Sequence, residues 1–213
     1  LIGLYRQIKE DRTTNFSSML SSLNEIWNRI GTTYTIFYAE KLQNIFLKYR
    51  EDKYTKEELK NCIIQFQITT LDDFDSYSQE WWIDRDFFER VLQKTLFQKM
   101  CTMKNNEFKR NIQLCDDDVT ENILTGCKQA FYAYIRYVFN NRETYNISDV
   151  KYACIYYFIR TFCYSSMFRY NEDGGFNVPY GGMTYNHNDF TKKITYIQSK
   201  PFQQRLQKTN ITN

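Results

Sequence analysis

Few residues in this 213-residue sequence could support acid–base, nucleophilic or metal chemistry. His187 is the single histidine, which excludes histidine-rich zinc sites and disfavours Ser/His or Cys/His catalysis. The six cysteines form no Cys-x-x-Cys pair, so we interpret them as small buried hydrophobic residues in a reducing compartment. Asp72, Asp73 and Asp75 fit a solvated acidic turn better than a metal cluster. A self-contained enzyme is therefore the least favoured hypothesis.

The chemistry that remains is that of a cationic surface, because positive charge is concentrated near the C-terminus. Residues 148–213 contain 8 Lys/Arg and 4 Asp/Glu, a net charge of +4, whereas residues 1–147 have a net charge of −1. A positive surface suits a phosphate-bearing partner, although a solvated helix face gives the same count. Lys192 and Lys193 are candidates for phosphate contacts, which position a nucleic acid without specifying its sequence.

The elements that must position these residues are predicted to be mostly helices, because only two prolines and seven glycines interrupt the chain. Ser148 is an expected N-cap, Thr55 and Glu58 form an expected capping pair, and Gly31 is expected to end the second helix. The helix over 150–164 is apolar nearly all round, which is typical of a buried position in a bundle. Hydrophobic spacing of three and four residues predicts helices over 1–9, 17–30, 32–49, 59–69, 85–103, 119–140, 150–164 and 189–199.

A short β-hairpin is predicted after the last strongly apolar helix. Residues 167–171 and 176–178 flank Glu172-Asp173-Gly174-Gly175, which places glycine at the turn. Residues 71–80 and 104–116 are predicted to be loops, and Pro201 to break or restart the last helix. We therefore expect a mainly α fold, a helical bundle that carries one short β-hairpin.

The most informative segment reads Tyr-Ser-Ser-Met-Phe-Arg-Tyr-Asn over 164–171 and Gly-Gly-Phe-Asn-Val-Pro-Tyr-Gly over 174–181. Its part over 169–181 resembles, without a gap, the hairpin of the Dam-type DNA adenine methyltransferases, Arg-Tyr-Asn-x-x-Gly-x-Phe-Asn-Val-Pro-Phe/Tyr-Gly. Leu1-Ile2-Gly3-Leu4-Tyr5 is similar to the Leu-Ile-x-x-Tyr of the helix that follows the acidic cofactor-binding strand in that family. The helical recognition domain of the family lies between these two landmarks.

The resemblance implies a target-recognition domain without its catalytic half. In the family a Phe-x-Gly-x-Gly loop binds S-adenosylmethionine and an Asp-Pro-Pro-Tyr motif holds the target amine, and neither occurs in this sequence. We expect residues 1–213 to be one helical target-recognition domain, excised from a larger Rossmann-like methyltransferase. It would contain a helical expansion over 35–146 and a DNA-reading β-hairpin over 165–182. S-adenosylmethionine would bind the missing catalytic part of the same polypeptide, with no metal.

Residues that touch the DNA bases follow from the same resemblance. Tyr164 matches an aromatic that inserts beside a flipped adenine, with Ser165 next to it; alternatively, Tyr164 is the last core aromatic of its helix. Arg169 matches the arginine that reads a guanine, since its planar fork can bond both major-groove acceptors; a surface arginine is the alternative. Met167 and Pro179 match apolar positions that contact a thymine methyl group.

Asn171 also belongs to this DNA-binding set, and we expect Asn171 and Asn177 to brace the turn through side chain-to-backbone bonds. Gly182-Met183 stands where relatives often carry a basic residue, so the family's default site, related to GATC, is not assured here.

The predicted function is sequence-specific recognition of double-stranded DNA for an S-adenosylmethionine-dependent enzyme that methylates the exocyclic amine of a flipped adenine. No apolar run is long enough to cross a membrane and no leader is evident, so a cytoplasmic location without a membrane partner is expected. The alternative hypothesis is a helical protein–protein interaction module without DNA activity, which would bind its partner in a salt-insensitive way.

Overall fold

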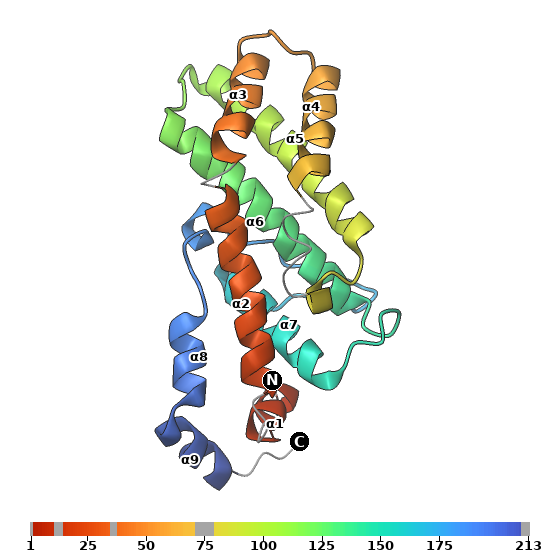
Figure 1. Cartoon of the computed structure of the whole chain (residues 1–213), viewed down its shortest axis with the longest axis vertical. Helices are drawn as coiled ribbons and strands as arrows, with labels where there is room; N and C mark the ends of the chain where they lie inside the picture. Colours follow the sequence, from red (N-terminus) through yellow and green to blue (C-terminus); the bar gives the residue numbers. More distant parts are fainter. Residues whose placement is uncertain (1, 11–14, 35–37, 71–78, 210–213) are drawn as a thin grey trace. The chain divides into compact units, whose positions relative to one another are not determined.

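The computed structural model describes residues 2–10, 15–34, 38–70 and 79–209 (Figure 1). The mainly α fold that the sequence predicts is confirmed. Short 3-10 turns at Gln79–Trp81, Tyr164–Ser166 and Met183–Tyr185 connect the longer helices. The α-helices of the described residues are α1 (Ile2–Glu10), α2 (Asn15–Thr33), α3 (Ala39–Arg50), α4 (Lys56–Thr70), α5 (Arg85–Arg110), α6 (Asp116–Asn140), α7 (Asp149–Phe162), α8 (Thr191–Gln198) and α9 (Lys200–Lys208).

The chain divides into two compact units. Unit 1 comprises residues 1–28, 135–181 and 188–213, and unit 2 comprises residues 29–134 and 182–187. The divisions fall inside α2 and α6, so each of these helices supplies residues to both units. All the DNA-binding residues that the sequence predicts belong to unit 1.

The core of unit 1 is aromatic. The indole ring of Trp27 lies 4.3 Å from the ring of Phe162 and 5.3 Å from that of Phe158, and its Nε1 donates to the Asn188 carbonyl at 2.8 Å. Phe190 packs against the same two phenylalanines of α7. Helix α7 is therefore largely buried, as its all-round apolar sequence predicts.

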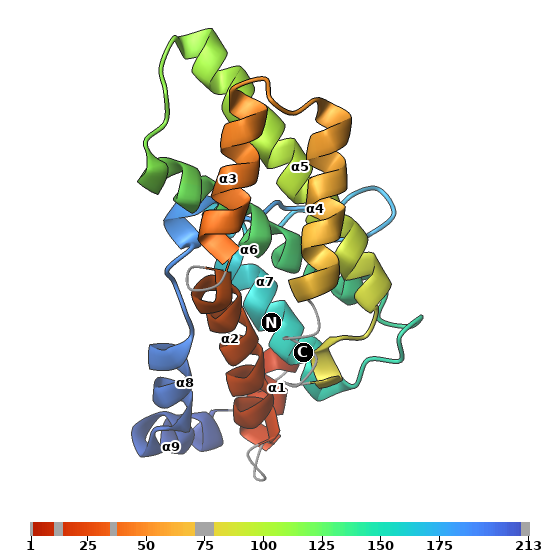
Figure 2. The same ribbon diagram turned by 45° about the horizontal axis from the view of Figure 1, so that its top comes forward.

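Unit 2 contains α3, α4 and α5, which pack together (Figure 2). Its aromatic cluster joins Trp82, Phe88, Phe131 and Tyr134. The hydroxyl of Tyr134 donates to the Trp81 carbonyl at 2.8 Å, and burial raises the pKa of Tyr134 to about 12. These aromatic residues thus serve as packing.

The predicted caps are present. The Glu58 amide donates to Thr55 Oγ1 at 3.2 Å, and the Thr55 amide donates back to the Glu58 carboxylate at 2.7 Å. Ser148 caps α7 through the Lys151 amide at 3.4 Å. Pro201 lies in the first turn of α9 and restarts the helix after Ser199, which accepts from the Phe202 amide.

Two predicted helix ends are wrong. Gly31 does not end α2; a Cβ there would lie 3.3 Å from Cε of Lys128, so glycine permits a close approach instead. Helix α5 continues through residues 104–110, predicted as a loop, because Met103 and Glu107 on its inner face are buried. Glu107 also accepts from the Leu114 amide at 2.8 Å, which ties the next segment to this helix end.

Other expectations are answered only in part. Helix α3 begins at Ala39, after residues 35–37, and the acidic turn over residues 71–78 lies outside the described residues. Cys154 and Cys163 are buried, but Cys115 is exposed, contrary to the prediction of buried cysteines. Within the described ranges no helix is long and apolar enough to cross a membrane, and no cluster of His, Cys, Asp and Glu could hold a metal ion.

Candidate functional site

The predicted hairpin exists as a chain reversal over residues 163–181, here called the hairpin. It has two isolated antiparallel bridges, Cys163–Tyr180 and Tyr170–Phe176, and no continuous strand ladder among the described residues. The Tyr164 amide donates to the Pro179 carbonyl at 2.9 Å. Two separated contact points therefore set the shape of the hairpin, and other groups must hold the backbone between them.

The turn of the hairpin is braced by Asn171. Its Oδ1 accepts from the Gly175 amide at 2.5 Å, while the Asn171 amide donates to the Gly175 carbonyl at 2.8 Å. Gly174 has φ = 77°, a left-handed conformation that side-chain-bearing residues rarely adopt. Asn171 therefore braces the turn through a side chain-to-backbone bond, and glycine stands at the turn, as the sequence predicts.

The returning arm of the hairpin alternates between core and solvent. Phe176, Val178 and Tyr180 are buried, whereas Pro179 is exposed and Asn177 is partly so. This period of two is that of a strand packed on one face. Pro179 therefore lies on the outer face of the hairpin, as a base-contacting residue would require.

Helix α6 holds the backbone of this arm. Arg136 Nη1 donates to the Val178 carbonyl at 2.9 Å. The side-chain amide of Asn140 donates to the Phe176 carbonyl at 3.0 Å, and its oxygen accepts from the Phe176 amide at 2.9 Å. Sequence reasoning missed Arg136 and Asn140; the available signal was two polar residues four positions apart in an otherwise apolar stretch.

Arg169 lies on the outer face and pairs with Asn177. Nε of Arg169 donates to Oδ1 of Asn177 at 2.8 Å, and the Asn177 amide donates to the Arg169 carbonyl at 3.1 Å. The two terminal nitrogens of the guanidinium make no hydrogen bond to any described residue. A fixed guanidinium with two free donors has the geometry needed for a bidentate acceptor such as a guanine edge.

The segment Tyr164–Ser166 is a short turn with a strained backbone, and the side chain of Tyr164 points outward from it. Ser165 and Ser166 both have left-handed backbones, with φ of 52° and 51°. Such conformations in serine cost free energy and cluster at functional sites. The side chain of Tyr164 is 53% exposed, so the hypothesis that it is a core aromatic is wrong. Met167 is also exposed on this segment.

The two predicted phosphate-contacting lysines behave differently. Lys193, in the first turn of α8, lines a cavity of about 400 Å³ together with Ser166, so it lies near the strained turn. Its Nζ is 5.8 Å from the ring centre of Tyr157. Lys192 is exposed, and within the described residues no hydrogen bond or ion pair joins it to the hairpin.

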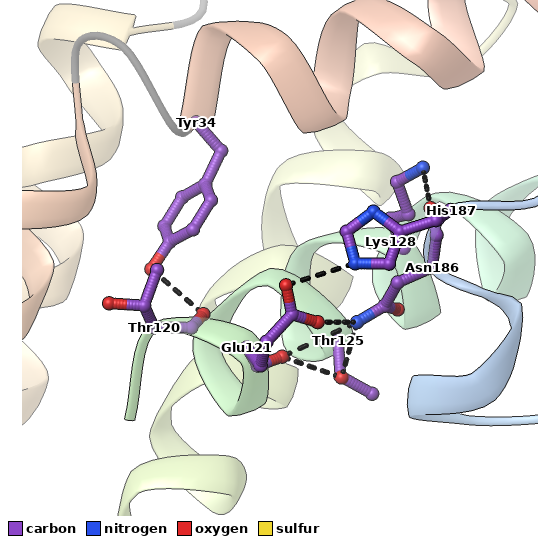
Figure 3. Close-up of polar contacts among 7 residues, drawn as sticks. All are labelled: Tyr34, Thr120, Glu121, Thr125, Lys128, Asn186 and His187. Carbon is purple, nitrogen blue, oxygen red and sulfur yellow. Dashed lines mark hydrogen bonds and ion pairs between the residues drawn. The ribbon is translucent and has the colours of Figure 1, made fainter. Parts of the chain in front are cut away.

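The segment that follows the hairpin belongs to unit 2 and is fixed to α6 (Figure 3). The side-chain amide of buried Asn186 donates to Glu121 Oε2 at 3.0 Å and to Thr125 Oγ1 at 2.9 Å. His187 Nε2 lies 3.0 Å from Glu121 Oε1, and its side chain is 75% exposed. The buried ammonium of Lys128 donates to the Asn186 carbonyl, a contact that the sequence did not reveal.

The glycine pairs of this chain do not fit a cofactor-binding loop. Gly174-Gly175 closes the hairpin turn, where the Gly175 amide is already used by Asn171. Gly182, with φ = 89°, leads only into the short turn Met183–Tyr185, and not into the N-terminus of a long helix that could hold an anionic group. These residues therefore supply no site for a nucleoside cofactor.

Comparison with known proteins identifies relatives of this chain. Residues 94–213 match the family model of the D12 class N6 adenine-specific DNA methyltransferases. The type II methyltransferase M.CviBI of Paramecium bursaria Chlorella virus NC1A is 37% identical over 84 residues, which cover 35% of this chain and 32% of that protein. This chain therefore spans about a third of the relative's length. No solved structure matches it significantly.

Proposed function

Because the chain belongs to the D12 class of N6 adenine-specific DNA methyltransferases, the Dam-type family, we propose that it is the target-recognition part of such an enzyme. The hairpin would read the DNA sequence from the major groove. The observation that carries this proposal is the Arg169–Asn177 pair, which leaves both terminal guanidinium nitrogens without a hydrogen-bond partner among the described residues, on an exposed turn.

Arg169 is proposed to donate both terminal N–H groups to O6 and N7 of one guanine, a contact worth roughly 1–3 kcal/mol of discrimination. Asn177 would hold the guanidinium plane in place, because its Oδ1 accepts the hydrogen bond from Nε of Arg169. Met167 and Pro179, which flank this pair on the outer face, would contact thymine methyl groups. Asn171 would keep the turn closed and lie close to the DNA backbone.

Tyr164 is proposed to enter the duplex beside the target adenine, with Ser165 next to it. Removing a base from the stack costs a few kcal/mol, and an exposed aromatic ring offsets part of that cost by stacking. The left-handed backbone of Ser165 and Ser166 supports this role, because it presents the ring to solvent. Lys192 and Lys193 would contact phosphates and position the protein without reading sequence.

The methyl transfer itself is assigned to another part of the polypeptide. Family members are methyltransferases, and S-adenosylmethionine is the proposed methyl donor, bound outside these 213 residues and used without a metal. The catalytic half of the same polypeptide and double-stranded DNA are the proposed partners. In this proposal residues 1–213 form one recognition domain, with a helical expansion within 35–146.

The proposal is tested by binding. The preferred site is first selected from a random duplex library with the 213-residue chain. Arg169→Ala is then expected to lower affinity for that site by roughly 5- to 100-fold and to flatten the preference at one G·C pair. Arg205→Ala, which removes an exposed arginine from α9 of the same unit, is the matched control. Equal loss on every sequence would contradict the reading role of Arg169.

One observation favours the alternative of a protein–protein interaction module. Phe108, near the end of α5, has 87% of its side chain exposed, and Ile112 nearby is also exposed. Exposed apolar side chains of this size often mark contact surfaces. DNA affinity that falls steeply with salt would favour recognition of DNA, whereas salt-insensitive binding to a protein would favour the module.

A further inference from the structure

Unit 1 contains a cavity of about 400 Å³ to which the proposed contacts with DNA bases assign no role. Its apolar lining includes Leu4 and Ile8 of α1, Ile197 of α8 and Phe202 of α9. Its polar lining includes residues from the end of α7, the strained serine turn and the start of α8, namely Tyr157, Arg160, Thr161, Ser166 and Lys193. The cavity thus joins an apolar side to a side rich in cations and hydroxyl groups.

The two cations of this cavity have no counter-charge among the residues that the structure describes. Arg160 contacts the ring of Phe168 at 5.6 Å and the hydroxyl of Tyr156, and Lys193 lies against the ring of Tyr157. None of the lining residues is acidic, and neither cation forms an ion pair with a described carboxylate. Two like charges that line one cavity repel each other, and an anion between them would relieve that repulsion.

The pKa of Lys193 supports this description. Burial lowers it below the ordinary value of 10.5, and the neighbouring guanidinium of Arg160 lowers it further. The second cause requires the ammonium to lie near Arg160, and both residues remain exposed to solvent, where an anion could reach them. A bound anion would act in the opposite direction and favour the charged ammonium.

We propose that Arg160 and Lys193 form a binding site for one backbone phosphate of the DNA, with hydroxyl groups of the cavity as further donors. This inference rests on the proposed function and deepens it by adding Arg160, which no sequence pattern singled out, to the DNA-binding surface. Arginine and lysine with hydroxyl donors are the usual partners of a phosphodiester oxygen.

The position of the site supports a phosphate of the DNA backbone as its ligand. Ser166 lines the cavity and lies three residues before Arg169, and Arg160 stacks on Phe168, which directly precedes Arg169. A phosphate held here would therefore lie next to the base-reading residues. Because phosphate contacts fix register, the site would place Tyr164 and Arg169 opposite the correct base pairs.

The first experiment needs no DNA. The ¹⁵N and ¹³C signals of the Arg160 guanidinium and the Lys193 side chain are followed by NMR in the 213-residue chain. The chain is titrated with dimethyl phosphate, a diester like the DNA backbone, and separately with inorganic phosphate. Shifts with dimethyl phosphate that disappear in Arg160→Gln and return in Arg160→Lys support the site. No saturable shift with either probe overturns it, and a response to inorganic phosphate alone overturns the diester assignment.

The second experiment measures duplex affinity over a range of salt concentrations. Loss of one phosphate contact reduces the slope of log K against log [salt] by about 0.9. Arg160→Gln and Lys193→Gln are each expected to do so and to weaken preferred and unrelated sequences alike. Combined, the two substitutions should be less than additive, because they share one phosphate. Arg205→Gln is the charge-matched control and should change the slope less.

The two proposals fail in different ways. If the chain selects a DNA sequence but the slope in Arg160→Gln equals that in Arg205→Gln, the phosphate site is wrong and sequence recognition stands. If the chain binds dimethyl phosphate through Arg160 but shows no affinity for duplex DNA, the recognition function is wrong and the phosphate of this site is not that of DNA. A single methylphosphonate position in the duplex that abolishes the effect of Arg160→Gln identifies the contacted phosphate.

Discussion

Nε of Arg169 and Oδ1 of Asn177 lie 2.8 Å apart, joining the two arms of the hairpin by a side-chain hydrogen bond. A free arginine loses considerable rotamer entropy when it binds a base, and this contact removes part of that entropy before binding. Asn177 is therefore expected to act on specificity through Arg169 and not through a base of its own.

Asn177→Ala should lower discrimination at the base pair read by Arg169 without abolishing it. The expected loss is smaller than the roughly 1–3 kcal/mol of the bidentate contact, because the guanidinium donors remain present. The measurement is a double-mutant cycle with Arg169→Ala, using the selected duplex and a duplex changed at one G·C pair. In Arg169→Ala the further loss of Asn177 should have almost no effect on discrimination. Additive effects would show that Asn177 reads a base independently.

Tyr164→Ala should weaken binding to an intact duplex by a factor that corresponds to loss of one base–aromatic stack, about 1–3 kcal/mol. The same substitution should matter less for a duplex with a mismatch at the target adenine, because that base is already unstacked. Tyr164→Phe keeps the ring and should behave like the native chain. Since Tyr164 is exposed, thermal unfolding should not change. An equal loss on matched and mismatched duplexes would argue against insertion.

Asn140→Ala should destabilise the hairpin, because it leaves the amide and the carbonyl of Phe176 without their partners. The expected decrease in the free energy of unfolding is about 1–3 kcal/mol, measured by urea denaturation, with faster exchange of the Phe176 amide hydrogen. Asn141→Ala is the matched control, since its side chain donates to the Tyr137 carbonyl of α6 and, within the described residues, to no group of the hairpin. Equal effects of the two substitutions would show that α6 does not anchor the hairpin.

The pKa of Lys193 should rise in Arg160→Gln, because the second cause of its depression is removed. In the native chain the folded-state pKa lies below the ordinary 10.5, so the unfolded state binds more protons between these two values. The free energy of unfolding should therefore rise with pH across that window, and the rise should be smaller in Arg160→Gln. The ¹³Cε shift of Lys193 against pH provides the measurement. A lower or unchanged pKa in the variant would mean that the two cations do not interact.

Sequence patterns predicted the helices where local signals and packing agree. The Thr55–Glu58 capping pair and the Ser148 cap rest on contacts within a few residues, and the all-round apolar sequence of α7 already predicts that this helix is buried. The end of α5 could not be predicted in this way, because Glu107 is held by Leu114 and Arg50, seven and fifty-seven residues away. The predicted helix end at Gly31 was wrong for a similar reason, because the side chain that lies close to Gly31, Lys128, is distant in sequence.

The candidate site was predictable to a different degree. The resemblance selected Arg169 and Tyr164, and the structure shows which side chains along residues 176–180 face outward. Arg136, Asn140 and Arg160 lie on helices, where their polar character alone predicts only a solvated face. Their roles depend on which backbone groups and cations the fold brings close to them, and no local pattern carries that information.

The anchoring of the hairpin by α6 also has an evolutionary consequence. Arg136 and Asn140 hold main-chain groups of Phe176 and Val178, which residues of nearly every type provide. Outward side chains of the hairpin can thus be exchanged without loss of these anchoring contacts to α6. Under the proposed function, a lineage that must change the sequence it marks, for example to escape a restriction enzyme, could do so through a few surface substitutions. The proposal then predicts that new specificities arise by mutation of the hairpin, while the helical scaffold is inherited unchanged.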